Sequence, residues 1–415
     1  MKTITLPQLA WHGNKKLELP LPDGWQVEMG DIAGHNRPAM KPAEIKAAIA
    51  NPIGTKPIRE LARGKNEVVI LFDDMSRVTR TSDMLPFVLE ELEQAGIPDS
   101  KIRFICALGC HGALDRIDFA KKLGNNVVAR FPVYNHNPFD KGTFVGTTSY
   151  GTKVYINPEV MKCDLKIAIG SVVPHPMTGF GGGGKIILPG VASFETIEQN
   201  HKECYRSMRE HREKPIAGMG LFDENPMRLD IEEAATLAGL DVLINSLFSI
   251  WGETVAVFAG ALKPAYAAAV KEAKAHYLTP RLSGKDIVIA NTFAKANEAF
   301  IGVGIAYGAV KREGGGDVVL IANAPDGQVI HYLLGNFGET AATPLASPTR
   351  VPRYVNDLII YSEYADCAGK DYYEKSRKVM CLDSWDAVLH TLQELHGSEA
   401  RVAVYPCAEV QYCAR

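Results

Sequence analysis

Residues 163–204 hold the densest group of side chains in this chain that could do chemistry. An apolar run leads to a Pro-His-Pro corner at His175, the glycines Gly181–Gly184 follow, and Lys185 comes directly after them. The next helical pattern starts at a serine and places His201 about two turns inside the helix. The segment therefore combines two imidazoles, an amine and a backbone that can approach a ligand closely. Such a combination indicates a site.

Two generic phosphate-binding motifs fit the glycines, and both fit badly. Gly179, Gly184 and Lys185 satisfy G-x-x-x-x-G-K, but Ile186 follows where a P-loop has Ser or Thr to hold magnesium. The stretch also contains G-x-G-x-x-G, yet Pro189 interrupts the helix whose N-terminus would face a pyrophosphate. The pattern supports a weaker statement: a nest of backbone N–H groups for an anion, beside a lysine.

The string PHPMTGFGGGGKIILPGVASFETIEQNH closely resembles the signature of the lactate racemase family. Members of that family use a nickel-pincer nucleotide, which is a pyridinium mononucleotide that carries nickel through two sulfurs and a carbon. The resemblance implies that Lys185 is covalently attached to this cofactor and that His201 ligates the nickel. It also implies that His175 is one of two catalytic bases.

Two further strings, DDMSRVTR and ALGCHGAL, resemble family motifs as well. They imply that Asp74 and Arg77 line the substrate and cofactor site and that His111 is the second catalytic base. The matching motifs lie between residues 73 and 201, and the resemblance is weak after residue 285.

The implied reaction explains these residue types. Inverting a 2-hydroxy acid by deprotonation would create a carbanion beside a carboxylate, which is electrostatically costly. Moving the hydrogen as hydride onto the cofactor avoids that carbanion and leaves a planar 2-keto acid. The two enantiomers present the hydroxyl proton on different sides, so two bases are needed, and His111 and His175 suit proton transfer at neutral pH. Arg77 can grip a carboxylate, and the N–H groups of Gly181, Gly182, Gly183 and Gly184 are expected to hold the mononucleotide phosphate.

The chain departs from the family pattern where the substrate binds. Gly112 and Ala113 follow the base histidine, whereas many family members have Arg-Pro there. In lactate racemases a Gln and a Lys from the second domain help to bind lactate. A gapped placement sets Glu298 against the Gln and Ile301 against the Lys, with Lys295 close enough to substitute. We therefore expect a 2-hydroxy acid other than lactate, longer or polyhydroxylated.

Each of these residues also has a purely structural interpretation. Asp73 and Asp74 could cap a helix, and Arg77 could form a surface salt bridge worth under about 1 kcal/mol. Glycine runs are often plain turns. At the level of function, the first alternative is a family member that uses the same cofactor for a different isomerase or redox reaction. The second is a phosphate- or nucleotide-binding module without covalent cofactor. His136, His211 and Trp385 are expected to be structural.

Composition bounds the class of protein. The chain has 415 residues, 46% of them hydrophobic, and a net charge of -3, which argues against a nucleic-acid or acidic-membrane surface. The first residues lack the apolar core of a signal peptide, and no uncharged apolar run reaches the roughly 18 residues of a membrane helix. The eight cysteines are scattered and form no C-x-x-C pair. We expect a reduced, cytoplasmic protein whose partners are a small 2-hydroxy acid and cofactor maturation enzymes.

Strand and helix patterns alternate along most of the chain, which predicts parallel α/β units. The string LTPRLSGK at 278–285 is the best linker candidate. We therefore predict an α/β fold of two α/β domains with the active site in the cleft between them. Residues 1–280 would form the N-terminal cofactor-binding and catalytic domain, and residues 281–415 a C-terminal domain that contributes to substrate binding. Asp74, Arg77 and His111 lie just past strand ends, where such sheets bind ligands.

Overall fold

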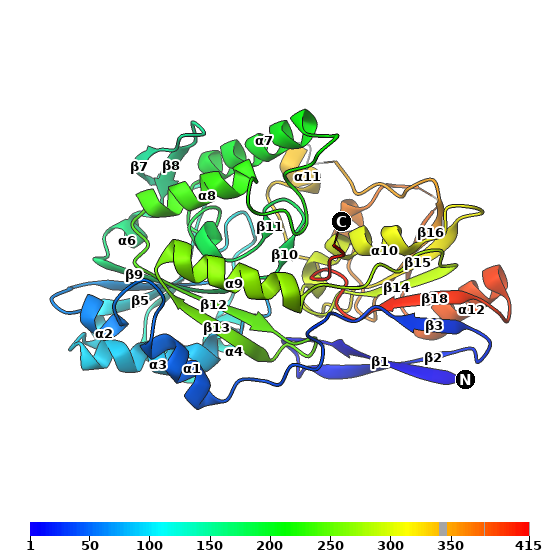
Figure 1. Ribbon diagram of the computed structural model, residues 1–415, viewed down its shortest axis with the longest axis horizontal. Coiled ribbons are helices and arrows are strands. Elements are labelled where there is room, and N and C mark those ends of the chain that lie inside the picture. The colour runs from blue at the N-terminus through cyan, green and yellow to red at the C-terminus, as the bar shows by residue number, and fades with distance from the viewer. Residues whose placement is uncertain (340–346, 377, 415) are drawn as a thin grey trace. The chain divides into compact units, whose positions relative to one another are not determined.

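The computed structural model describes residues 1–339, 347–376 and 378–414. The chain forms two compact units (Figure 1). Unit 1 comprises residues 1–35, 250–252 and 275–415, and unit 2 comprises residues 36–249 and 253–274.

Unit 2 is built on a six-stranded sheet with the order β13-β12-β9-β4-β5-β6. All neighbours pair in parallel apart from β12 and β13, which form an antiparallel hairpin. From β4 the chain builds toward β5 on one side and later adds β9 on the other, so the strand order reverses between β4 and β9. The carboxyl ends at such a switch point are where open α/β sheets bind ligands. The strands are β4 (Val68–Phe72), β5 (Ile102–Cys106), β6 (Val133–Asn135), β9 (Leu165–Ser171), β12 (Val242–Phe248) and β13 (Thr254–Gly260).

Every residue of β4 and β9 is buried, as expected for parallel strands covered on both faces. Figure 1 shows α1 and α3 on one side of this sheet and α9 on the other. Two short hairpins, β7 (Thr143–Thr147) with β8 (Lys153–Ile156) and β10 (Pro174–His175) with β11 (Gly179–Phe180), lie outside it. The helices are α1 (Pro42–Ala50), α2 (Ile58–Leu61), α3 (Thr81–Gln94), η1 (Asp99–Lys101), α4 (Arg116–Leu123), α5 (Asn125–Arg130), α6 (Pro158–Met161), η2 (Gly183–Ile186), α7 (Phe194–Glu210), α8 (Pro226–Leu237) and α9 (Leu262–His276).

Unit 1 contains a second six-stranded sheet, which is parallel throughout and has the order β17-β16-β15-β14-β18-β3. Its order reverses between β14 and β18, which gives this unit a switch point of its own. The strands are β3 (Gln26–Met29), β14 (Ile287–Asn291), β15 (Gly316–Ile321), β16 (Val355–Tyr361), β17 (Val379–Leu382) and β18 (Arg401–Tyr405). The remaining elements are the hairpin of β1 (Lys2–Gln8) and β2 (Lys15–Leu21) and the helices η3 (Ala296–Gly302), α10 (Val303–Ala309), α11 (Gly335–Gly338), η6 (Ala368–Tyr372) and α12 (Trp385–His396). Among the described residues, no helix is both long and apolar enough to cross a membrane.

The predicted α/β class is confirmed. The division of the chain differs from the expected one. The break expected near residue 280 falls between residues 274 and 275, and residues 1–35, expected in the N-terminal domain, group with unit 1. The reason is that β3 pairs with β18, a partner far away in sequence. The predicted cleft between the domains stays a prediction.

Candidate active site

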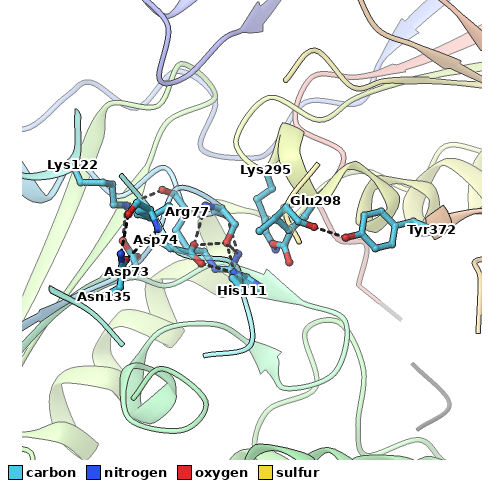
Figure 2. A network of polar contacts seen from close by, with 12 residues as sticks. Asp73, Asp74, Arg77, His111, Lys122, Asn135, Lys295, Glu298 and Tyr372 are labelled. Atoms are coloured by element: carbon cyan, nitrogen blue, oxygen red, sulfur yellow. Dashed lines mark hydrogen bonds and ion pairs between the residues drawn. The ribbon is translucent and has the colours of Figure 1, made fainter. Parts of the chain in front are cut away.

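The loops after β4 and β5 bring Asp74 and His111 together. Asp74 follows the end of β4 and is buried; its Oδ1 accepts hydrogen bonds from the amide (2.9 Å) and hydroxyl (2.5 Å) of Ser76. Its Oδ2 contacts Nδ1 of His111, which lies on the loop after the neighbouring strand (Figure 2). The parallel pairing of β4 with β5 places both loops at the same edge, so these two predicted site residues meet for a topological reason.

This contact fixes the proton on the His111 ring. Burial alone would raise the pKa of Asp74, but His111, Arg77 and the Ser76 hydroxyl hold that pKa well below its usual range. The carboxylate is therefore charged and can only accept, so Nδ1–H of His111 donates to it. In the neutral ring the lone pair then lies on Nε2. This is the arrangement that a general base needs.

The neighbouring carboxylate has a different partner, which the sequence analysis missed. Oδ1 of Asp73 accepts from Nζ of Lys122 at 2.6 Å, and this lysine of α4 is fully buried. Lys122 also donates to the carbonyls of Arg77 (3.0 Å) and Thr79 (3.3 Å), so it ties α4 to the loop after β4. Burial nevertheless raises the pKa of Asp73, against the effect of Lys122 and Thr79. Asp73 thus belongs to the support of the loop.

Arg77 completes this loop. Its Nη1 donates to the carbonyl oxygen (2.8 Å) and hydroxyl (2.7 Å) of Ser76, and the side chain is half-buried. In Figure 2 the guanidinium lies beside Asp74 and His111. The guanidinium is therefore held near the two residues with which it was predicted to act.

His175 and Lys185 lie in direct contact. The β10–β11 hairpin holds the ring, because Nδ1 accepts from the amides of Met177 (3.2 Å) and Thr178 (3.3 Å). The other ring nitrogen, Nε2, is 2.9 Å from Nζ of Lys185. The hairpin amides therefore fix the ring of His175 at Nδ1, and Lys185 meets it at Nε2.

His201 is presented by α7 as a neutral imidazole. Its Nδ1 pairs with the carbonyl oxygen of Ile197 at 2.8 Å, one turn earlier, so Nδ1 carries the hydrogen and Nε2 the lone pair. Burial, together with the charge of Lys185, lowers the pKa of His201 to about 4. A neutral ring with one nitrogen fixed by a carbonyl is the usual form of a metal-ligating histidine. Among the described residues, no group of three or more His, Cys, Asp or Glu side chains lies close enough together to hold a metal ion.

The glycine run packs against the protein more tightly than a phosphate nest would. The amide of Gly181 donates to the carbonyl of Val173 (2.7 Å), and the amide of Gly183 donates to Oδ1 of Asn245 (2.8 Å). Two of the four amides expected to hold a phosphate are thus already bonded inside the protein, and the predicted phosphate contact rests on those of Gly182 and Gly184.

Close packing explains why these positions are glycine. Gly183 has φ +59°, and a Cβ there would lie 2.2 Å from Nη2 of the buried Arg228 and 2.8 Å from the ring of Tyr266. Arg228 also donates to the carbonyl oxygen of Gly182 (3.0 Å) and stacks on Tyr266. The run is therefore a rigid, buried turn that aims Lys185.

In unit 1 the two residues expected to bind substrate form an ion pair with each other. Nζ of Lys295 lies 2.7 Å from Oε2 of Glu298, and both side chains are at most 5% exposed. They follow β14, at the switch point of their sheet. Figure 2 shows the Glu298 carboxylate directed toward Tyr372.

Two other residues singled out from the sequence have structural roles. His136 is buried, with Nε2 bonded to the Ala192 carbonyl (2.9 Å) and Nδ1 accepting from Asn157 (3.1 Å). Burial lowers the pKa of His136 to about 4. Ser193 occupies the N-cap position of α7 as predicted, although its hydroxyl bonds to that of Thr196 (3.1 Å) and not to a helix amide. The eight cysteines form no disulfide.

Comparison with known proteins places this geometry in a family. Residues 12–213 match the model of the lactate racemase N-terminal domain. The lactate racemase of Thermoanaerobacterium thermosaccharolyticum is 30% identical over 334 residues, which cover 79% of this chain and 76% of that relative. This chain belongs to the lactate racemase family. It is accordingly an isomerase of the racemase type.

A second relative and two solved structures are also similar to this chain. The lactate racemase of Lactiplantibacillus plantarum is 28% identical over 288 residues, covering 68% of this chain and 66% of that protein. The lactate racemase apoprotein structure from T. thermosaccharolyticum aligns over the full length of both chains, with a TM-score of 0.73 and 23% identity. A Thermotoga maritima protein aligns over 90% of this chain and 98% of its own, with a TM-score of 0.67 and 19% identity. The structural matches support the fold of this family member.

We predict that Lys122→Met destabilises unit 2 by about 3–5 kcal/mol, because it leaves the Asp73 carboxylate buried without its ion-pair partner. Urea unfolding monitored by circular dichroism measures the change. The matched control is Lys121→Met, which removes the neighbouring lysine from a loose pair with Asp118 at 3.5 Å and should cost under about 1 kcal/mol. Equal destabilisation by the two variants would contradict the assignment.

We also predict that Gly183→Ala costs about 2–4 kcal/mol, since the methyl group meets Arg228 and Tyr266 in a left-handed backbone conformation. Gly239→Ala is the control. That glycine has φ +71° with open space around a Cβ, so the substitution costs only the strain of a left-handed backbone, about 1 kcal/mol. Similar unfolding midpoints for the two variants would show that the glycine run is not tightly packed.

Proposed function

We propose that this family member racemises or epimerises a 2-hydroxy acid with a nickel-pincer nucleotide tethered to Lys185. The contact between Nζ of Lys185 and Nε2 of His175, 2.9 Å apart, carries the proposal. It joins the expected cofactor anchor to an expected acid–base residue at the carboxyl end of the sheet of unit 2. A nucleotide-binding module has no need of such a pair.

The residues of this chain fit the cofactor. Lys185 offers a half-buried amine, and His201 offers a neutral imidazole whose Nε2 bears the lone pair. A nitrogen ligand of this kind suits nickel. When bound, the cofactor would supply an electron-poor carbon that accepts a hydride from the substrate. Cofactor maturation enzymes would have to supply the group.

The chain's own groups would move the proton. Nε2 of neutral His111 can take the substrate hydroxyl proton while Asp74 stabilises the imidazolium through Nδ1. His175, the other ring of the pair, would return a proton to the product. In the opposite direction the two rings exchange roles, which a racemase requires. Arg77 would bind the substrate carboxylate with its guanidinium.

The substrate is proposed as a 2-hydroxy acid other than lactate. Lys295 is already neutralised by Glu298, so unit 1 offers carboxylate oxygens as well as an ammonium group. Carboxylates accept hydrogen bonds from hydroxyl groups, which favours a longer or polyhydroxylated acid. The named relatives are lactate racemases, and efficient racemisation of lactate by loaded enzyme would overturn this choice.

We predict that protein co-expressed with a cofactor-making pathway gains mass and near-stoichiometric nickel, and that Lys185→Ala gains neither. Intact-protein mass spectrometry and metal analysis measure both. His201→Ala should keep the mass increase and lose nickel. Lys202→Ala, an exposed neighbour of His201 paired with Glu198, is the control and should load normally. If a known family member loads in the same host and this protein does not, the tethered-cofactor mechanism is wrong.

We predict that Asp74→Asn lowers kcat of loaded enzyme by about 10²–10⁴-fold, since an amide cannot both fix the Nδ1–H tautomer and stabilise the imidazolium of His111. The rate is measured by enantiomer-resolved chromatography. Asp99→Asn removes an exposed carboxylate paired with Arg130 and should leave kcat unchanged. Unchanged turnover in Asp74→Asn would remove His111 from the acid–base pair.

A further inference from the structure

Unit 1 contains a buried carboxyl group that none of the roles above uses. Glu409 lies on the loop after β18 and has no exposed surface. Its Oε1 accepts from the amides of Ala294 (2.7 Å) and Lys295 (3.2 Å). Its Oε2 is also buried and has no hydrogen-bond partner. A half-satisfied buried carboxyl is costly for the fold, so its presence calls for a role.

The position of Glu409 suggests that role. The strand order of unit 1 reverses between β14 and β18, and the loops that leave these strands are joined there. Thr292 and Cys407 form a bridge, and the amide of Ala408 donates to the carbonyl of Asn291 (2.8 Å). Glu409 adds the last link, because it accepts hydrogen bonds from the amides of Ala294 and Lys295. It therefore fixes the turn that carries the Lys295–Glu298 pair.

The charged and titratable groups around Glu409 come from several elements. Lys295 faces it from the loop after β14, and Cys407 from its own loop; the negative charge of Asp31 acts on Cys407 in turn. Glu298 faces Lys295, and Tyr372 of η6 faces Glu298. Burial raises the pKa of Glu409 to about 7, outweighing the amide hydrogen bonds and the charge of Lys295. Glu409 thus changes charge near neutral pH.

We propose that Glu409 is a positioning residue for substrate binding, which holds Lys295 and Glu298 in place and tunes the charge that Lys295 presents. This rests on the proposed function, in which Lys295 and Glu298 bind substrate. While Glu409 is uncharged, Lys295 is paired with the carboxylate of Glu298. Once Glu409 ionises, Lys295 shares its charge between two carboxylates, and an anionic substrate is bound less well.

The positioning is tested first without substrate, by hydrogen exchange of the peptide that contains Ala294 and Lys295. Exchange should be slow in wild type and in Glu409→Gln, whose side-chain oxygen still accepts both amides. It should be at least about tenfold faster in Glu409→Ala, which removes the acceptor. Equal exchange in all three proteins would overturn the proposal. Glu399→Gln, an exposed residue before β18, is the control and should exchange as wild type does.

Substrate binding is tested on cofactor-loaded enzyme with a 2-hydroxy acid that wild type turns over. Between pH 6 and pH 8 the wild-type KM should rise by up to about tenfold relative to that of Glu409→Gln, which has no proton to lose. The two proteins share every other group, so kcat should change with pH in parallel. A KM ratio that stays constant with pH would overturn the tuning role. Loaded enzyme that turns over no 2-hydroxy acid would refute the proposed function, and hydrogen exchange would still decide the positioning.

Discussion

Asp73 and Asp74 directly follow β4, a strand that is buried along its whole length. Burial removes the hydration of both carboxylates, so each needs a partner inside the protein. They are compensated by different elements. Lys122 of α4 neutralises Asp73, and His111 of the loop after β5 pairs with Asp74. Burial, with a smaller effect from the charge of Asp74, raises the pKa of Asp73, whereas the pKa of Asp74 is lowered. Both carboxylates tie the loop after β4 to neighbouring elements, and in the proposed mechanism Asp74 also assists proton transfer at His111.

Much of the fold could be predicted from local patterns, and the exceptions have a common cause. The apolar run at Val68–Phe72 and the helix at Pro42–Ala50 are set by burial and spacing within a few residues. The pairing of β3 with β18 and the burial of Lys122 depend on contacts between segments far apart in sequence. A lysine in the last turn of a helix looks exposed unless the partner beneath it is known.

The candidate site shows the same division. Motif positions singled out five candidates: Asp74, His111, His175, Lys185 and His201. In the structure Asp74 contacts His111, Lys185 contacts His175, and His201 is bonded to a carbonyl of its own helix. The bonding of the Gly181 and Gly183 amides inside the protein could not be predicted, because glycines that serve phosphate binding and glycines that serve close packing look alike in sequence. Only the neighbouring residues distinguish the two kinds of glycine. Here Arg228 fills the space beside Gly183, and Oδ1 of Asn245 accepts a hydrogen bond from the Gly183 amide. The sequence indicates Glu409 only weakly, through its position shortly after a buried strand.

Both sheets bury charged groups at the point where their strand order reverses, and stability alone does not explain this. A buried ion pair such as Lys295–Glu298 contributes little net stability compared with apolar residues of similar size, because desolvation offsets its attraction. The unpartnered Oε2 of Glu409 makes the fold less stable still. Natural sequences break the rules of packing mainly at positions under functional constraint. The same argument applies to Asp74 and His111, and it is consistent with the proposal that these two pairs serve substrate binding and proton transfer.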